Sequence, residues 1–468
     1  MMKTSGSRPS LSGSRILHQP RTMKIDTDLA EDILKKAIRN GADLAEVFML
    51  SARSLSVEVK SREIDALETS MDFGYSLRVI KNQRLGFSYS TEPKNRQRVV
   101  DDALESSLFT GEDPCLDIAG PATCPEIDIY DETIAAISEE DAIDRVKRIE
   151  DTALKRDRRI KKVRKASGSF AEAEILILNS KGLQAGYRST SASAQIMVVA
   201  EDGHDAQMGW GYESNRFLRG VDFEMAGREA ADRALRLLGA RKIVTGKGSV
   251  LLDSSVASEF LSLLASSFSS ENVQKGKSLL IGRKGERVVS EKINIVDNGL
   301  LKGAVGSRPF DAEGTPSLEK RLIQGGRLTG YMYNIYTAGK DGTVSTANAV
   351  RHGIHGVPVV GISNLYLEGA SDKFIYGYDE LTGRMERGLL VTEAMGIHMA
   401  NPITGEFSIG VTGLWIEGGE VRHPVKEAAI SGNILGFFGN IAGVSRNLRF
   451  YGNIGAPDIL IEDVDISG

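Results

Sequence analysis

The stretch RKIVTGKGSVLLDSSVASEFLSLLASSF, residues 241–268, decides the fold because it separates two halves of the chain that carry different patterns. Its segment 249–253 is typical of a short strand, and residues 254–268 predict a helix. Ser254 or Ser255 is the expected N-cap of that helix. The apolar side chains expected to face the core are Val256, Phe260, Leu263 and Leu264.

The residues before this stretch carry strand-like and helix-like patterns in turn. Segments 45–70 and 74–91 are typical of strands joined by polar turns, and segment 97–108 predicts a helix. The same order returns later, with strands expected over 171–214 and a helix over 224–240. The N-terminal half is therefore predicted to contain two loosely repeated strand–turn–strand–helix units.

A basic run, KRDRRIKKVRK at 155–165, raises the question of nucleic-acid binding. It has no interleaved aromatic residues, and it ends a helical pattern that opens with the acids Glu139, Glu140 and Asp141. A helix end that leads into a strand is therefore the favoured interpretation. The net charge of −5 also argues against a dominant nucleic-acid surface.

The residues after the stretch are rich in glycine and in strand-like segments. Gly418 and Gly419, for example, predict a tight hairpin turn. The expected fold class is α+β, with an N-terminal α/β-mixed domain over 23–240 and a β-rich C-terminal domain over 241–468. Residues 1–22 are rich in serine and arginine and are expected to be a disordered leader, although a transit-like function is open on composition.

The cysteine content and the hydropathy indicate where the protein works. Cys115 and Cys124 are the only cysteines, which suits a reducing cytoplasm and gives no disulfide framework. No apolar run reaches the length of a membrane-spanning helix, so no membrane contact is expected.

The common catalytic motifs, including the phosphate-binding P-loop, the nucleophile elbow and H-E-x-x-H, are absent from the sequence. His352 and His355 lie three residues apart and could hold a metal with His398 as a third ligand. Gly353, Gly356 and Pro358 are poor helix formers, so the pair would not share a helical face. A glycine-bordered loop is the favoured interpretation.

Several C-terminal segments together resemble the TldD/PmbA family, once called modulators of DNA gyrase. The segments are KGKSLLIGRKGERVVSEKINIVDNG (275–299), RPFDAEGTPSLEKRLIQGGRLTGYMYNIYTA (308–338), GTVSTANAVR (342–351), MGIHMANPITGEFSIGVTGLWIEGGEVRHPVKEAAISGNI (395–434) and GAPDILIEDVDISG (455–468). The resemblance extends from Met23 to the end, mainly as pattern in the N-terminal half. It implies a peptidase family with two branches, one zinc-bearing (TldD) and one its partner (PmbA, also called TldE).

The family's zinc motif discriminates between the branches. Its H-E-x-x-x-H falls on Leu261, Ser262 and Ser266, and its late cysteine falls near Gly443. None of these residues is a good zinc ligand, so the chain resembles the PmbA/TldE branch. The serines of this segment would let a partner chain or a peptide backbone approach closely, or would simply face solvent. They are Ser262, Ser266, Ser267, Ser269 and Ser270.

The resemblance implies a cytoplasmic, non-catalytic subunit without a cofactor of its own, paired with a TldD-like zinc peptidase chain that acts on unfolded peptides. Ser345, Thr346, Asn348 and Asn364 are the candidate substrate-binding residues, or else turn residues that bond their own backbone. Two alternatives stay open. One is a stand-alone homodimeric peptide-binding or regulatory protein, and the other is an autonomous metal peptidase built on His352, His355 and His398.

Overall fold

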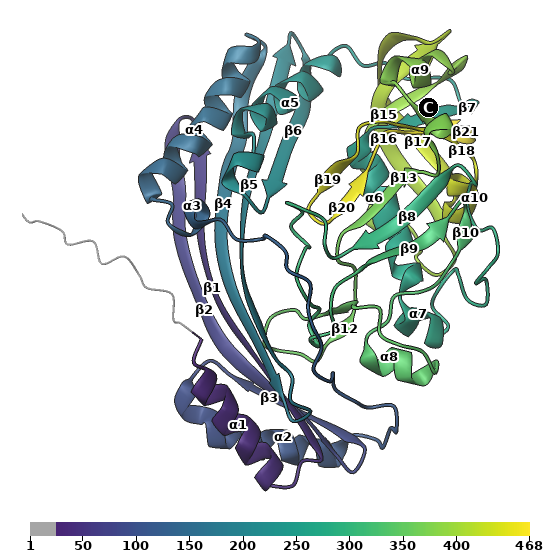
Figure 1. Cartoon of the computed structure of the whole chain (residues 1–468). Helices are drawn as coiled ribbons and strands as arrows, with labels where there is room; N and C mark the ends of the chain where they lie inside the picture. The colour runs from purple at the N-terminus through teal and green to yellow at the C-terminus, as the bar shows by residue number, and fades with distance from the viewer. Residues whose placement is uncertain (1–24) are drawn as a thin grey trace, which may run out of the picture.

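The computed structural model describes residues 25–468, so the predicted leader over 1–22 lies outside the described residues (Figure 1). The fold is α+β, as predicted, with a β-rich C-terminal half. The predicted division near residue 240 falls between helix α5, which ends at Arg236, and strand β7, which begins at Gly246. That division into domains stays a prediction.

The N-terminal half is built on one antiparallel sheet with the strand order β3-β2-β1-β4-β5-β6. Its strands are β1 (Leu44–Lys60), β2 (Glu63–Lys81), β3 (Arg84–Ser90), β4 (Ile160–Asn179), β5 (Gln184–Asp202) and β6 (Asp205–Asn215). Four of these strands have 17 to 20 residues, and Figure 1 shows them as one long, curved layer.

Two groups of helices cover the ends of this sheet. Helices α1 (Thr27–Arg39) and α2 (Arg96–Ser106) pack at one end. Helices α3 (Glu132–Ala135), α4 (Glu139–Arg156) and α5 (Phe223–Arg236) pack at the other. The basic run at 155–165 forms the end of α4 and the start of β4, which confirms the structural interpretation of that run.

The predicted repeat is present, and each unit is larger than the sequence pattern indicated. Helix α1, strands β1 to β3 and helix α2 form one unit, and α4, β4 to β6 and α5 form the other. Strands β1 and β4 pair antiparallel from Glu46 to Val59, which joins the two units into one sheet.

The C-terminal half contains fifteen strands among the described residues. They are β7 (Gly246–Leu252), β8 (Ile293–Asn298), β9 (Glu319–Gln324), β10 (Arg327–Leu328), β11 (Ala349–Val350), β12 (Val359–Val360), β13 (Leu365–Gly369), β14 (Ile375–Tyr376), β15 (Arg387–Met395), β16 (Glu406–Glu417), β17 (Glu420–Asn433), β18 (Ile441–Ser445), β19 (Arg449–Tyr451), β20 (Ile454–Ala456) and β21 (Ile459–Ser467). Its helices are α6 (Ser254–Ala265), α7 (Ser270–Gln274), α8 (Ile335–Lys340), α9 (Tyr378–Gly383) and α10 (Ile434–Gly439).

The larger C-terminal sheet closes on itself. It has the order β14-β18-β21-β17-β16-β15-β7, and β21 also pairs with β7, so β7, β15, β16, β17 and β21 form a ring. Gly418 and Gly419 have φ of 61° and 76° in the turn between β16 and β17, so the pair of glycines forms the predicted tight hairpin turn. The second sheet, β10-β9-β8-β13-β20-β19, lies beside the ring.

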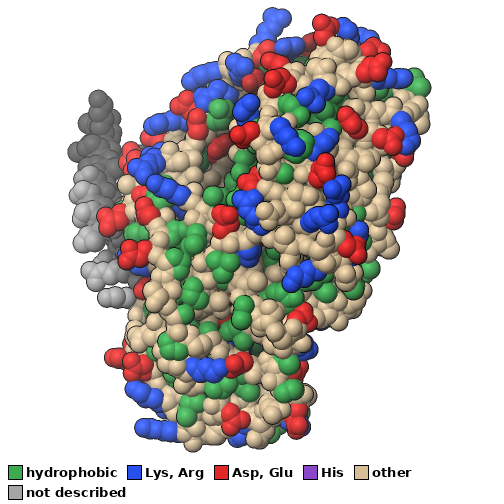
Figure 2. Space-filling model, turned by 45° about the vertical axis from the view of Figure 1, so that its right-hand side comes forward, with side chains coloured by type: hydrophobic (Ala, Val, Ile, Leu, Met, Phe, Trp, Pro, Cys, Tyr) green, Lys and Arg blue, Asp and Glu red, His purple; other side chains and the backbone are tan. Residues whose placement is uncertain are grey.

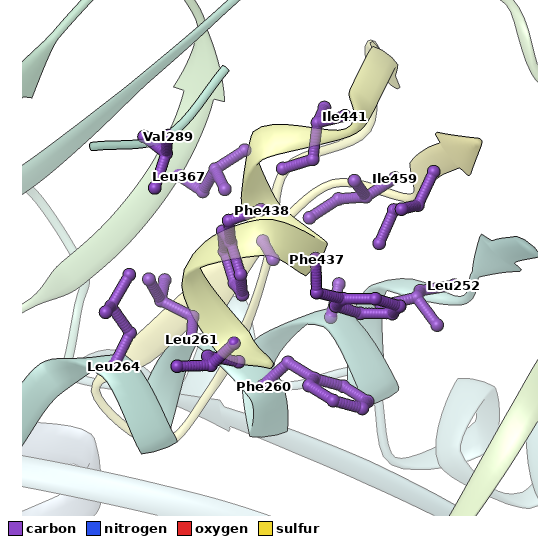
Figure 3. Close-up of a cluster of buried hydrophobic side chains, with 14 of the residues drawn as sticks. Leu252, Phe260, Leu261, Leu264, Val289, Leu367, Phe437, Phe438, Ile441 and Ile459 are labelled. Carbon is purple, nitrogen blue, oxygen red and sulfur yellow. The ribbon is translucent and has the colours of Figure 1, made fainter. Parts of the chain in front are cut away.

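Helix α6 packs into the largest apolar core of the molecule. Phe260, Leu261 and Leu264 are fully buried and face Phe437 and Phe438 of α10 (Figure 3). The predicted N-cap is one or two residues too late, because the Asp253 carboxylate accepts the Ser255 N–H and caps the helix. Leu263, predicted to face inward, is only partly buried, and Leu261 takes the core position.

A buried ionic cluster joins the two halves. Arg78 of β2 donates to Glu46 of β1 at 3.1 Å and to Glu313 of the C-terminal half at 3.0 Å. Arg351, also of the C-terminal half, donates to the second oxygen of Glu46 at 2.7 Å. The two arginines balance the two carboxylates, which is the condition under which buried charges are tolerated.

The surface carries both signs of charge. Figure 2 shows acidic and basic side chains interspersed over the face that it draws. Within residues 25–468 no helix is both long enough and apolar enough to cross a membrane. Cys115 and Cys124 are free, half-buried thiols, in agreement with a sequence that gives no disulfide framework.

Candidate functional site

A cleft between the N-terminal sheet and helix α6 contains the strongest candidate site. Its main cavity has a volume of about 300 Å³ and is lined from three segments that are far apart in sequence. The lining residues are Gln195, Trp210 and Tyr212 of β5 and β6, Ser255, Ser258, Glu259 and Ser262 of α6, and Tyr451 and Ile454 of β19 and β20.

The two faces of α6 explain why serines line this cavity. Phe260, Leu261 and Leu264 form the face buried in the core, and the opposite face carries Ser258 and Ser262. Residues four apart lie one above the other on a helix, so these two small side chains leave open space beside the helix. The Ser258 hydroxyl donates to the Ser254 carbonyl at 2.8 Å, and Ser262 is exposed.

Alternation along β6 turns its large side chains toward the cleft. A Cβ atom on Gly209 would lie 2.2 Å from the Ala230 carbonyl oxygen, and one on Gly211 would lie 2.0 Å from that of Ala226. Helix α5 therefore covers the face of the strand on which the glycines lie. Trp210 sits between them and points to the opposite face, into the cavity.

The aromatic side chains form one wall of the cavity. The rings of Trp210 and Tyr451 meet edge to face with centroids 5.8 Å apart. Tyr212 stacks on Tyr451 with centroids 6.4 Å apart. The Arg233 guanidinium lies 4.1 Å from the centroid of the Trp210 ring, which is a cation–π distance.

A second hollow of about 140 Å³ shares Trp210, Ser255 and Glu259 with the main cavity. Its further lining includes Met197 and Met208 of the N-terminal sheet, together with Val256, Thr392, Glu393, Ala394 and Met395. Methionine side chains adapt to irregular apolar partners. Because the two hollows share three lining residues, they lie side by side between the halves, and together they are called the cleft.

Two carboxylates give the cleft its charge. Burial and the neighbouring Glu393 carboxylate raise the pKa of Glu259 to about 7. Burial also raises the pKa of Glu393 above its ordinary value. The Oε2 atom of Glu259 is buried and has no hydrogen-bond partner among the described residues. A buried carboxylate oxygen without a donor is costly, so this atom needs a partner from outside the chain.

The positions of the family zinc motif do not form a metal site here. Leu261 is fully buried in the core, and the half-buried Ser266 donates to the Leu263 carbonyl at 3.3 Å. Only Ser262 of the three positions lines the cleft. A Cβ atom on Gly443 would lie 2.5 Å from the Tyr376 ring, so the late cysteine position has no room for a side chain.

The other serines of this segment do not line the cleft. Ser267 and Ser270 are fully buried, and Ser269 is 7% exposed. The Ser270 hydroxyl donates to Thr337 Oγ1 at 2.8 Å. Ser262 alone thus fits the expectation that this row of serines leaves room for a partner chain or a peptide.

The histidine alternative gains no support from the geometry. His352, His355 and His398 are all exposed, and His355 packs its ring edge to face against Tyr89. Over residues 25–468 no group of three histidine, cysteine, aspartate or glutamate side chains lies close enough to hold a metal ion.

The four predicted substrate-binding residues lie in internal hydrogen-bond networks. Asn348 is fully buried and donates to Asp297 and to the Gly361 carbonyl. Asn364 is fully buried and donates to the Asn298 carbonyl. The hydroxyls of the half-buried Ser345 and Thr346 lie 3.3 Å from the Tyr333 carbonyl oxygen. None of the four lines the cleft, and their contact with a substrate stays a prediction.

Sequence reasoning missed the residues that build the cleft. Trp210, Tyr451 and Glu393 come from separate segments, and no local pattern connects them. Glu259 carried a usable signal, because it is the only charged residue in the helix segment 254–268. A lone acid on a helix of apolar residues and serines was a candidate for a functional side chain.

Three family models match the chain in order. They are described as PmbA/TldA metallopeptidase domain 1 (residues 45–107), central domain (132–238) and C-terminal domain (245–468). Metalloprotease PmbA of Escherichia coli O157:H7 is 29% identical over 450 residues, covering 93% of this chain and 96% of that protein. A PmbA homologue of Buchnera aphidicola is 29% identical and covers 97% of both chains.

Solved structures are similar over nearly the whole chain. A Thermotoga maritima protein named for modulation of a DNA gyrase superposes with a TM-score of 0.87 at 27% identity, covering 94% of this chain and all of that chain. TldE of Thermococcus kodakarensis superposes with a TM-score of 0.85 at 23% identity, with the same coverage, which establishes a shared fold.

Proposed function

Because the chain belongs to the PmbA/TldD metallopeptidase family, we propose that it is the non-catalytic subunit of a TldD/TldE-type peptidase complex. In this role it pairs with a zinc-bearing, TldD-like chain in the cytoplasm and helps to hold unfolded peptides. The family matches confirm the resemblance that the C-terminal motifs carry. The PmbA/TldE branch, the partner and the peptide substrate are part of the proposal.

One observation carries the proposal. Helix α6 presents its exposed face to an open cleft, yet the positions where the family places its zinc ligands are Leu261, Ser262 and Ser266. The buried leucine side chain has no donor atom, and a neutral serine hydroxyl is a poor zinc ligand. The residues present therefore do not fit a zinc ion at this site, and we derive no catalytic step through one.

The cleft itself supports a role in holding an extended chain. It has an apolar and aromatic wall, adaptable methionines and a few polar groups, which is the usual composition of a ligand site. Small serines on α6 allow a peptide backbone to come near. The contribution of this chain is thus to bind and orient a peptide, while the partner supplies the chemistry.

The decisive experiment mixes this protein with a TldD-like zinc chain and an unfolded peptide. We expect cleavage by the mixture and none by this chain alone. A Ser262→Trp variant, which fills the cleft, should slow cleavage while leaving association of the two chains intact. Ser408→Trp, at an exposed position of β16 outside the cleft, is the matched control.

Three results would contradict the proposal. Cleavage by this chain alone that a chelator blocks would indicate an autonomous metal peptidase. Failure of the two chains to associate, with peptide still bound, would indicate a stand-alone binding protein. Equal effects of the Ser262 and Ser408 substitutions would remove the cleft from the function.

A further inference from the structure

We propose that the cleft contains a subsite for a positively charged group of the peptide, an ammonium or a guanidinium, held between the Glu259 and Glu393 carboxylates and the Trp210 wall. This inference rests on the proposed function, because it names the chemical class that the cleft selects.

The first step is the unsatisfied carboxylate. Glu259 Oε2 is buried without a hydrogen-bond partner, and the atom belongs to a residue that lines both hollows of the cleft. Neither Glu259 nor Glu393 forms an ion pair within residues 25–468. A ligand with a charged N–H donor would satisfy this oxygen and offset the repulsion between the two carboxylates.

The second step is that the nearby arginines form their ion pairs with acids other than Glu259 and Glu393. Arg233 pairs with Glu229 at 2.9 Å and with Asp253 at 3.2 Å. Arg236 lies 3.8 Å from Asp253, and Arg449 pairs with Glu229 and Glu213. Arg233 acts electrostatically on Glu259, and Arg233 and Arg236 act on Glu393, but none of these arginines forms an ion pair with either carboxylate. A cationic ligand would therefore provide the first direct ion pair to Glu259 and Glu393.

The third step is the aromatic wall. Trp210 already accepts the Arg233 guanidinium at 4.1 Å from its ring centroid, which shows that this indole is placed for cation–π contact. Tyr212 and Tyr451 complete the wall and bring the negative faces and polar tips of their rings to the same cavity. A lysine or arginine side chain could lay its apolar stem along this wall.

The fourth step is size. The hollow of about 140 Å³ that Glu259, Glu393 and Trp210 line together is below the usual size of ligand pockets, so it suits the charged end of one side chain or one chain terminus rather than a whole peptide. The adjoining cavity of about 300 Å³, which shares Glu259 and Trp210, would receive the neighbouring residues of the peptide. The charged group can therefore come from a lysine or arginine side chain or from the peptide's N-terminal ammonium.

Tryptophan fluorescence provides the test, because the chain has only two tryptophans. In a Trp415→Phe background, Trp210 reports directly on the cleft. The full-length protein is titrated with an unstructured peptide of alanine, serine and glycine that carries one lysine. Matched peptides replace the lysine by norleucine, or acetylate the N-terminus, or carry both changes.

We expect the lysine peptide to bind roughly tenfold more tightly than the doubly neutral peptide. Glu259→Gln and Glu393→Gln should each remove most of that preference, whereas Glu63→Gln, an exposed substitution on β2, should leave it unchanged. If a variant fails to fold, the salt dependence of peptide binding by the protein without the glutamate substitutions decides. The affinity should fall with rising salt for the charged peptides only. Whether acetylation or norleucine causes the loss identifies the source of the charge.

The failure modes of the two proposals differ. Equal affinity of the Trp415→Phe protein for the charged and the doubly neutral peptides overturns the cationic subsite and leaves the proposed function standing. Absence of binding of any peptide, by this chain alone and in the mixture with the zinc chain, overturns the proposed function and the subsite together.

Discussion

Arg449 and Glu229 form a bidentate ion pair, in which each of the two terminal guanidinium nitrogens donates to one carboxylate oxygen at 2.6 Å. Arg449 lies in β19 of the C-terminal half and Glu229 in α5 of the N-terminal half. The same Glu229 accepts from Arg233, which also contacts Asp253, the cap of α6. The pair therefore fixes the aromatic wall of the cleft against the helix that faces it.

Arg449→Met should lower stability by about 2–3 kcal/mol, because it leaves Glu229 and Glu213 partly buried with one fewer positive charge. The shift of the thermal unfolding midpoint measures the effect. Arg422→Met breaks an exposed pair with Glu420 and should cost less than about 1 kcal/mol. An equal shift for both variants would show that the Arg449–Glu229 pair stabilises the protein no more than the exposed Arg422–Glu420 pair.

Glu259 should make stability depend on pH. The folded-state pKa lies near 7, above the ordinary value of 4.5, so the folded protein holds a proton that the unfolded chain releases between these values. Stability should therefore fall as pH rises from about 4.5 to 7, by roughly 1 kcal/mol once solvent exposure is considered. Thermal unfolding midpoints of the parent protein and of the Glu259→Gln variant, measured across this pH range, give the contribution of Glu259. Identical pH dependence of the two midpoints would contradict the prediction.

Leu261 and Ser262 are adjacent in α6, but Leu261 is buried in the core and Ser262 faces the cleft, so a histidine should be tolerated very differently at the two positions. Leu261→His buries a polar ring in the apolar core and should cost about 2–4 kcal/mol. Ser262→His faces the open cleft and should stay within about 0.5 kcal/mol of the parent protein. Thermal unfolding of the two variants is the comparison, and equal tolerance would indicate that α6 is rotated relative to this structure.

Restoring the zinc motif should not restore a zinc site. A triple variant with Leu261→His, Ser262→Glu and Ser266→His still lacks the late cysteine, whose position at Gly443 faces the Tyr376 ring. We expect well below one zinc ion per chain by metal analysis after dialysis. Stoichiometric zinc in the folded variant would contradict this prediction, because it would show that the core can accommodate a histidine side chain at position 261.

Gly443 should be intolerant of any side chain. A Cβ atom there would lie 2.5 Å from the Tyr376 ring, so Gly443→Ala should cost about 1–3 kcal/mol. Gly436→Ala in α10 meets nothing within 4 Å and should be neutral or slightly stabilising. The two unfolding midpoints, measured side by side, test the crowding at β18.

Local chemistry allowed part of this fold to be predicted. Residues 26–42 are typical of a helix with Asp26 or Thr27 as its N-cap and Gly41 past its end. In the structure Asp26 caps α1, and Gly41 follows the helix with φ of 95°. The cap of α6 was misplaced because Asp253 stands just before two serines that are equally good caps by type. Choosing among three neighbouring oxygen-bearing side chains requires the backbone geometry, which the sequence does not contain.

The cleft could not be predicted for a different reason. Trp210, Glu259 and Tyr451 come together only after α5 packs on the glycines of β6 and the two C-terminal sheets form. Those contacts join segments up to about 240 residues apart, and no local periodicity encodes them. The residues favoured as substrate ligands, such as Asn348 and Asn364, instead occupy buried networks that hold loops together.

The ring of strands in the C-terminal half has a consequence for how the protein is made. Strand β21 closes the ring by pairing with β7, and their partners Ile461 and Val250 are separated by most of that half. While the ribosome is still synthesising residues 253–458, the edge of β7 that later pairs with β21 stays unpaired. Newly made chains should therefore depend on chaperones until residue 467 emerges, and premature termination before β21 should yield protein that aggregates or is degraded.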